Sequence, residues 1–180
     1  TPRFPIREVI IGPLRLTTTF PSETSSTIRK TRTDLFVDLS GIAKGYGVDQ
    51  VAEMMESHGI KHYMIEIGGE IRARGTNAQE LPWQIGIEKP LAGGPLHKVL
   101  ALNNIALATS GNYRNFFEIA GRHYIHIIDP TTGWPIENDL ASVTVMIDSC
   151  MRADAWATAL QVLGFKRGMA IAENLDLPVL

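Results

Sequence analysis

The sequence predicts an α+β fold with a largely antiparallel sheet. Short runs of alternating or apolar residues follow one another with turn residues between them, which is typical of strands joined by hairpins. Only three segments have the apolar spacing of helices, at residues 41–57, 150–163 and 166–174. Strands that mostly follow each other directly, with few helices among them, favour α+β.

A polar segment and a short apolar one precede the first helix. Residues 17–33 are rich in Thr and Ser, which predicts a surface loop or a polar edge hairpin. Residues 34–40 resemble a short strand. The helix over 41–57 has one apolar face, formed by Val48, Val51, Ala52 and Met55. Gly59 is well suited to end this helix, because glycine readily adopts positive φ.

The remaining strands are predicted from alternation and from the turns that separate them. Asn103 and Asn104 form a turn-prone pair that divides one apolar stretch into two strands. The segments expected to be strands are 62–67, 70–73, 83–88, two within 98–109, 122–128, 142–148 and the start of one at 176–180.

Composition excludes several classes of protein. The chain has 180 residues, of which 44% are hydrophobic and 20% charged, with a net charge of −2, so it is expected to form one globular domain over 1–180. The sequence has no basic run to attract nucleic acid, and its apolar stretches are too short to span a bilayer. The single cysteine, Cys150, excludes an internal disulfide and a cysteine-based zinc site.

Residues 38–49, DLSGIAKGYGVD, combine small residues with one lysine at the start of a helix. Small residues let the backbone approach another group closely. The N–H groups at a helix start suit a phosphate, to which Lys44 would add a positive charge. A glycine-rich turn with a surface lysine is the alternative, and the spacing alone leaves both open.

Two turn segments carry polar groups. In HIIDPTTGWP, residues 126–135, Asp129 is expected either to accept N–H groups within the turn, or to face a metal or act as a base. A hairpin turn with His126 on the surface is the simpler interpretation. In TSGNY, Thr109 and Ser110 offer hydroxyl groups that would hold a polar ligand or cap the next element.

The segment RADAWATAL, residues 152–160, places two oxygen-bearing side chains in an apolar helix. Asp154 and Thr158 are one turn apart and therefore face the same way. A carboxylate and a hydroxyl suit a hard cation, and so few protein ligands are typical of Mg²⁺. The alternative is that Asp154 caps its own helix and Thr158 bonds back to a helix carbonyl.

Taken together and in this order, these segments resemble the ApbE family, the bacterial FAD:protein FMN transferases. The resemblance is strongest over residues 38–164, in six stretches: DLSGIAKGYGVDQVAE, IEIGGEIRARG, WQIGIEKP, ALATSGNYRNFFE, HIIDPTTGWP and SVTVMIDSCMRADAWATALQVLG. It implies an ApbE-type α+β fold and a Mg²⁺-dependent reaction. In that reaction a threonine hydroxyl of a target flavoprotein attacks FAD, which leaves FMN on the protein and releases AMP.

The resemblance also implies roles for individual residues. It places the metal at Asp154, Thr158 and the carbonyl of Gly41. The ligand types leave Ca²⁺ open as an alternative to Mg²⁺. It places His126 and Asp129 nearest the phosphate chemistry, with His126 helping to deprotonate the threonine. The residues it assigns to the flavin nucleotide are Asp38, Lys44, Gly68, Gly69, Glu88, Thr109, Ser110 and Ile127.

Family members carry an N-terminal portion that the residues before 38 do not match, so the chain is expected to be a shortened version. Two other activities therefore stay open: binding of FAD or another nucleotide without transfer, and hydrolysis of FAD to FMN and AMP. The resemblance further implies a periplasmic or extracytoplasmic location, with any membrane tether lying outside this chain.

Overall fold

The structure is a computed structural model that describes residues 17–22, 25–29, 38–90, 94–112, 116–119, 122–138 and 140–180. The chain divides into two compact units, one comprising residues 1–38 with the turn at 129–134, the other comprising 39–128 and 135–180. In the first unit, β1 (Thr17–Ser22) and β2 (Ser25–Arg29) form an antiparallel hairpin. For the Thr- and Ser-rich segment, predicted to be a surface loop or a polar edge hairpin, the structure thus has a hairpin; the other residues of this segment lie outside the described ones.

The second unit is built on a four-stranded sheet with the strand order β10-β7-β4-β3. All neighbouring strands in it are antiparallel, which confirms the predicted α+β class. Gly68 and Gly69, with φ of 60° and 99°, form the tight turn between β3 and β4. The strands are β3 (Tyr63–Ile67), β4 (Glu70–Arg74), β7 (Ile105–Gly111) and β10 (Ser142–Ile147).

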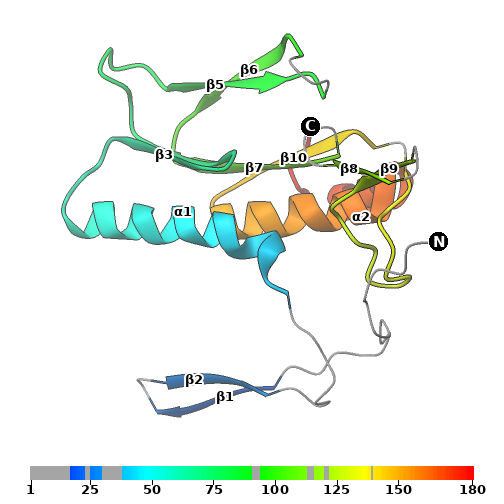
Figure 1. Cartoon of the computed structure of the whole chain (residues 1–180). Coiled ribbons are helices and arrows are strands. Elements are labelled where there is room, and N and C mark those ends of the chain that lie inside the picture. The colour runs from blue at the N-terminus through cyan, green and yellow to red at the C-terminus, as the bar shows by residue number, and fades with distance from the viewer. Residues whose placement is uncertain are drawn as a thin grey trace. The chain divides into compact units, whose positions relative to one another are not determined.

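Two helices, α1 (Ser40–Ser57) and α2 (Cys150–Asn174), lie side by side on one face of this sheet (Figure 1). Gly164, with φ of 72° and ψ of 174°, interrupts α2, so the two helices predicted at 150–163 and 166–174 are the two parts of one broken run. Asp38 and Leu39 are not in a strand and Ser40 opens α1. The predicted strand over 34–40 is therefore wrong at its end, and residues 34–37 lie outside the described part.

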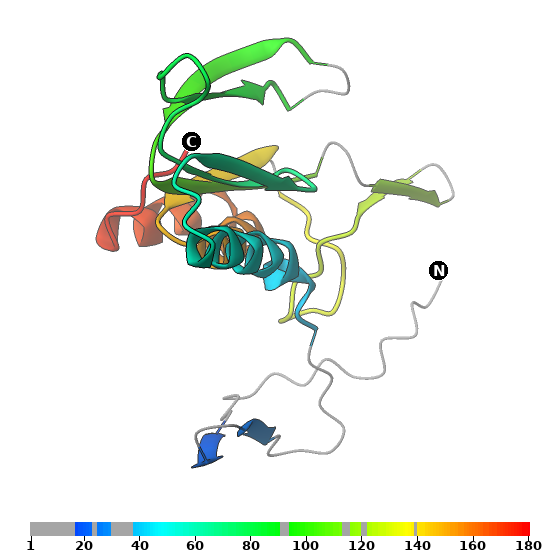
Figure 2. The same cartoon turned by 90° about the vertical axis from the view of Figure 1, so that its left-hand side faces the viewer.

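A hairpin of β5 (Trp83–Glu88) and β6 (Leu96–Leu102) covers the opposite face, so the unit has three layers (Figure 2). Successive side chains of β7 point to opposite faces of the sheet, so Leu107 packs toward this hairpin while Ala106 and Ala108 pack toward the helices. A second hairpin joins β8 (Phe116–Ile119) to β9 (Arg122–Ile125). The predicted strand start at 176–180 is a single bridge between Val179 and Val145.

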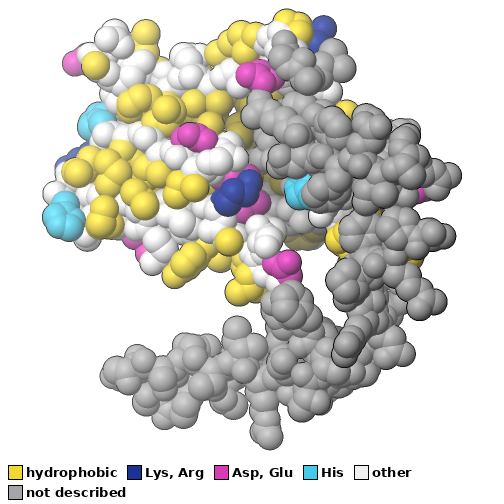
Figure 3. Space-filling model, viewed as in Figure 1, with side chains coloured by type: hydrophobic (Ala, Val, Ile, Leu, Met, Phe, Trp, Pro, Cys, Tyr) yellow, Lys and Arg dark blue, Asp and Glu magenta, His cyan; other side chains and the backbone are white. Residues whose placement is uncertain are grey.

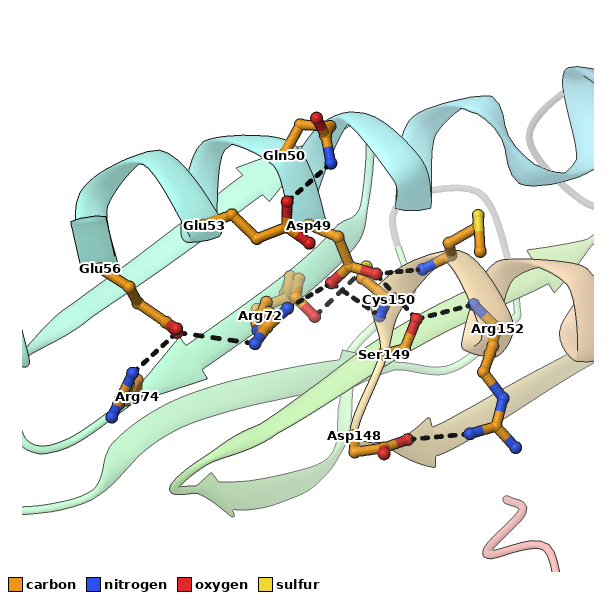
Figure 4. Close-up of polar contacts among 12 residues, drawn as sticks. Asp49, Gln50, Glu53, Glu56, Arg72, Arg74, Asp148, Ser149, Cys150 and Arg152 are labelled. Carbon is orange, nitrogen blue, oxygen red and sulfur yellow. Dashed lines mark hydrogen bonds and ion pairs between the residues drawn. The ribbon is translucent and has the colours of Figure 1, made fainter. Parts of the chain in front are cut away.

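Asp49 of α1 fixes the start of α2 (Figure 4). Its carboxylate accepts the N–H groups of Cys150 and Met151 at 3.1 and 3.0 Å and the Ser149 hydroxyl at 2.8 Å. Arg72 of β4 donates to it at 2.8 Å. N–H groups at a helix start have no partner within the helix, so this carboxylate satisfies two of them and complements the helix dipole. The Asp49 contacts thus hold α1, α2 and β4 together.

We expect Asp49→Asn to lower the free energy of unfolding by about 2–4 kcal/mol, because a mostly buried, charged acceptor of four hydrogen bonds becomes neutral. Urea unfolding at neutral pH measures this loss. Gln50→Ala is the matched control, because Gln50 lies next to Asp49 in α1 but its amide bonds to the carboxylate of Glu53, three residues along the same helix, in an exposed position. A loss for Asp49→Asn no larger than that of the control would contradict the assignment.

The same contact predicts a dependence on pH. Burial alone would raise the pKa of Asp49, but the donors from Met151, Ser149, Arg72 and Cys150 outweigh it and lower the pKa below its ordinary value of 3.8. A lowered pKa means that the stabilisation is present above the unfolded-state value and is lost as the pH falls through the folded-state value. The difference in stability between wild type and Asp49→Asn should therefore be constant above about pH 5 and shrink below about pH 4.

Some large hydrophobic side chains of α1 and β3 remain exposed. Tyr46 and Met54 on α1, and Met64 and Ile67 on β3, are exposed, and hydrophobic side chains gather over this part of the surface in Figure 3.

Neither helix of the described part is both long and apolar enough to cross a membrane.

Candidate functional site

The candidate site lies where α1 and α2 run against each other. Gly41, Gly45 and Asp49 are spaced by four residues and so share one face of α1. Along α2 their partners are Thr158, Asp154 and Cys150, also spaced by four and met in reverse order. The two helices are therefore antiparallel along this contact, and the spacing brings residues more than 100 positions apart into register.

Gly45 is the point of closest approach between the helices. A Cβ atom built on it would lie 2.3 Å from the carbonyl oxygen of Cys150 and 2.8 Å from Cβ of Asp154, so no side chain fits. Its N–H group donates to Oδ2 of Asp154 at 3.0 Å. The small residues of 38–49 are expected to let the backbone approach another group closely. At Gly45 that group is α2. Asp154 bonds across to α1, whereas the cap of α2 is Ser149, so the interpretation of Asp154 as its own helix cap is wrong.

Thr158 and Gly41 meet one turn further along. A Cβ atom built on Gly41 would lie 3.3 Å from Cγ2 and 3.5 Å from Oγ1 of Thr158. The Thr158 hydroxyl lies 3.1 Å from the Ser110 hydroxyl, which β7 directs toward the helices. We call the Gly41 carbonyl, the Asp154 carboxylate and the Thr158 hydroxyl the oxygen cluster. The structure therefore brings the three residues predicted to hold the metal, Gly41, Asp154 and Thr158, to one helix crossing, with Ser110 beside Thr158.

A lysine–glutamate pair borders the oxygen cluster. Nζ of Lys44 lies 2.6 Å from Oε1 of Glu70, whose side chain is 1% exposed, while that of Lys44 is 46% exposed. A Cβ atom on Gly68 would lie 3.1 Å from Cδ of Lys44, so the turn between β3 and β4 passes close to the lysine stem. Lys44 and Gly68, both predicted to contact a nucleotide, are thus neighbours.

The electrostatics of this region favour a cation. Burial raises the pKa of Asp154, while the Gly45 N–H and the Lys44 charge act in the opposite direction. Burial also raises the pKa of Glu70, and the Asp154 charge adds to that rise although Lys44 opposes it. Among the described residues, Lys44 thus lies near two buried carboxylates, so an added positive charge would stabilise the ionised form of both.

The donor set of the oxygen cluster fits Mg²⁺ better than a transition metal. Its three groups are all oxygens, and hard cations prefer oxygen. Within the described part of the chain, no group of three or more His, Cys, Asp or Glu side chains is placed to hold a metal. A metal here would therefore have one charged ligand and two neutral ones, and would keep open positions for water or phosphate, as Mg²⁺ usually does.

The other predicted site residues lie in several places. Thr109 bonds to Thr144 at 2.8 Å on the sheet face opposite to Ser110, so the pair is split by strand alternation. Glu88 ends β5 and is exposed, Asp38 precedes α1, and His126 and Ile127 follow β9, His126 exposed and Ile127 buried. The contact of these residues with a nucleotide stays a prediction.

Asp129 lies in the other compact unit, within a tight turn. Its side chain accepts the N–H and the hydroxyl of Thr131, both at 2.7 Å, and its N–H donates to the Trp134 carbonyl at 2.9 Å. These are the turn contacts expected of an Asp-Pro segment. A catalytic role for Asp129 stays a prediction.

Sequence reasoning missed two carboxylates, Glu70 and Asp49. Glu70, Arg72 and Arg74 alternate along β4 with the apolar Ile71 and Ala73. Polar residues at every second position of a strand between two apolar layers signal charged partners on one side. Those partners are on α1, where Lys44 pairs with Glu70, Asp49 with Arg72, and Glu56 with Arg72 and Arg74.

Comparison with known proteins gives a consistent result. A model of the ApbE family matches residues 6–180. A "FAD:protein FMN transferase" of Vibrio cholerae is 53% identical over 156 residues, which are 86% of this chain and 47% of that protein. A protein of the same name from Haemophilus influenzae is 49% identical, over 86% of this chain and 45% of its own length. The chain thus spans about half the length of these curated relatives.

Solved structures agree with the sequence comparison. The flavin transferase ApbE from Vibrio cholerae superposes with a TM-score of 0.75 at 48% identity, over 90% of this chain and 50% of that one. The ApbE protein from Thermotoga maritima superposes with a TM-score of 0.77 at 30% identity, over 90% of this chain and 52% of its own. The fold predicted from the sequence is therefore confirmed.

Proposed function

The chain belongs to the ApbE family, and on this basis we propose that it takes part in transferring FMN from FAD to a threonine hydroxyl of a target flavoprotein. The transfer is Mg²⁺-dependent and releases AMP. The threonine oxygen forms a bond to the phosphorus of the FMN half, the phosphoanhydride bond to AMP breaks, and the threonine proton passes to a base. The observation that carries this proposal is the oxygen cluster, which two distant segments build at one helix crossing.

In this proposal the oxygen cluster holds Mg²⁺, with Asp154 as its charged ligand and Thr158 and the Gly41 carbonyl as neutral ones. When bound, Mg²⁺ would offset negative charge on the phosphate oxygens, which is the main requirement of phosphoryl transfer. Lys44 supplies a second positive charge beside the cluster and binds the diphosphate of FAD. The N-terminus of α1, which contains Gly41 and Lys44, adds the positive end of its helix dipole.

His126 acts as the base toward the threonine, and Asp129 takes part in the phosphate chemistry; the support for both is the family resemblance. A positioned general base contributes about 10²–10⁴-fold to such a reaction, because a threonine hydroxyl is a weak nucleophile. His126 is exposed, as an attack by a residue of another protein requires.

Incubation with FAD, Mg²⁺ and a peptide bearing an acceptor threonine tests the function. We expect flavin fluorescence on the peptide after denaturing electrophoresis, and its loss when Mg²⁺ is chelated. Release of AMP without labelled peptide would show that the chain hydrolyses FAD and does not transfer FMN. Bound FAD with neither product would reduce the function to nucleotide binding.

Thr158→Val should raise the Mg²⁺ concentration needed for half-maximal transfer by about tenfold or more, because it removes a neutral oxygen of the cluster and keeps the side-chain shape. Thr158→Ser keeps the hydroxyl and is the matched control, with a requirement expected within about twofold of wild type. An unchanged requirement in Thr158→Val would remove Thr158 from the site.

A further inference from the structure

Glu70 is a buried carboxylate that the proposed reaction does not use. Its side chain is 1% exposed, and Oε1 accepts a hydrogen bond from Nζ of Lys44 at 2.6 Å. Its second oxygen, Oε2, is buried and makes no hydrogen bond within the described part of the chain. A carboxylate withdrawn from water with half of its bonding capacity unused is costly to the fold. Such a group is retained more readily where it serves a purpose other than stability.

The contacts of Lys44 indicate what that purpose is. Lysine has a long flexible side chain, and nearly half of this one is exposed. Glu70 nevertheless holds its ammonium group, and its stem passes so near Gly68 that a Cβ atom there would lie 3.1 Å from Cδ. Glu70 itself is fixed, because β4 is paired with β3 on one side and β7 on the other. A rigid strand thus holds a flexible cation.

The held ammonium group lies beside the oxygen cluster. Gly45, the residue after Lys44 in α1, donates its N–H to Oδ2 of Asp154 at 3.0 Å, and Nζ of Lys44 lies 2.6 Å from Oε1 of Glu70, so Lys44, Asp154 and Glu70 are close in space. Two of the three are carboxylates. Glu70 therefore places the lysine where it can meet an anion that binds next to Asp154.

We propose that Glu70 is a positioning residue, which acts on the diphosphate of FAD only through Lys44 by holding the lysine ammonium beside the oxygen cluster. The proposal rests on the proposed function for the identity of the anion. A lysine ordered before binding loses less conformational freedom when the ligand arrives, so affinity improves without any contact between Glu70 and FAD.

If Glu70 served only to link β4 to α1, removing another ion pair between these two elements would affect FAD binding in the same way. Arg74, on the same strand and the same face, pairs with Glu56 of α1 at 2.9 Å, four residues along β4 from Glu70. This pair also links β4 to α1, but it involves neither Lys44 nor the oxygen cluster. Arg74→Gln is therefore a matched control for the loss of one strand–helix ion pair.

A double-mutant cycle on the full chain tests the proposal. FAD binding is measured by flavin fluorescence for wild type, Glu70→Gln, Lys44→Met and the double variant, with thermal unfolding to confirm folding. We expect Glu70→Gln to weaken FAD binding by about tenfold in wild type and by less than about twofold in Lys44→Met, with Arg74→Gln unchanged within about twofold. An equal effect of Glu70→Gln in both backgrounds, or none in wild type, would overturn the proposal.

A readout without FAD separates this proposal from the proposed function. In protein labelled with ¹⁵N-lysine, the ammonium signal of Lys44, assigned by its absence in Lys44→Met, should be ordered in wild type and lost to exchange in Glu70→Gln. An equally ordered signal in Glu70→Gln would overturn the positioning role even if FAD is transferred. If the Lys44 signal loses its order in Glu70→Gln but the wild-type chain does not bind FAD, the positioning role stands and the proposed function is rejected.

Glu70→Asp provides a second variant should Glu70→Gln not fold. It keeps the charge but withdraws it by one methylene, so the lysine is held less closely. We expect FAD affinity between those of wild type and Lys44→Met. An affinity below that of Lys44→Met would overturn the proposal, because Glu70 would then act by a route other than the lysine.

Discussion

Gly45→Ala is expected to separate α1 from α2 and to abolish Mg²⁺-dependent flavin transfer. The added methyl group would lie 2.3 Å from the Cys150 carbonyl oxygen and 2.7 Å from its carbonyl carbon. Both atoms belong to the backbone of α2, so no side-chain rotation relieves the clash. We expect a loss of about 3 kcal/mol or more in the free energy of unfolding, at the upper end of overpacking effects. Urea unfolding and the peptide-labelling assay measure the two consequences.

Gly47→Ala is the matched control for this prediction. Gly47 lies in the same helix, but a Cβ atom on it would meet only the flexible end of Ile67, at 3.4 Å. Alanine is favoured over glycine in a helix interior, so this variant should be as stable as wild type or more stable, by up to about 1 kcal/mol. Similar losses in both variants would show that α1 tolerates no added side chain, and would remove the special role of Gly45.

Asp154→Ala is expected to reduce Mg²⁺-dependent transfer by about a hundredfold or more while the chain still folds. Asp154 is the only charged member of the oxygen cluster, so its removal leaves two neutral ligands for a divalent cation. Burial raises the pKa of Asp154, which means that the ionised carboxylate lowers the stability of the fold and is not needed for folding. The stability lost with the bond from the Gly45 N–H should stay within about 2 kcal/mol.

Asp148→Asn is the control for Asp154→Ala. The Asp148 side chain is 81% exposed and contacts Arg152 at 3.3 Å on the outer side of the first turn of α2. This variant removes one carboxylate from the same region without touching the oxygen cluster. Its transfer rate should match wild type within about twofold, since exposed ion pairs contribute little. A chain that transfers flavin equally well with Asp154→Ala would refute the metal site.

Periodicity predicted the elements whose signals are local. The apolar spacing around Val48 and Ala52 gave the extent of α1, and alternation gave the strand at 83–88. The break in α2 was also readable, because Gly164 separates two apolar patterns. The strand expected at 34–40 failed at its end, because Ser40 already opens α1 and Asp38 and Leu39 precede it outside any strand.

The candidate site was predictable only in part, for a similar reason. Asp154 and Thr158 share a helix face, and a spacing of four residues shows this from the sequence alone. That Gly45 bonds to Asp154 depends on contacts between residues 109 positions apart, which local patterns do not carry. Glu70 was missed because its partner Lys44 lies 26 positions away on another element.

Binding of Mn²⁺, as a spectroscopic substitute for Mg²⁺, tests the central claim most directly, namely that α1 and α2 together form one divalent-cation site. Electron paramagnetic resonance of free Mn²⁺, with and without saturating FAD, measures the bound fraction for wild type, Asp148→Asn and Asp154→Ala. We predict one bound ion in wild type and in Asp148→Asn, and an affinity at least about tenfold lower in Asp154→Ala. Equal Mn²⁺ affinity in Asp154→Ala and wild type would contradict the account.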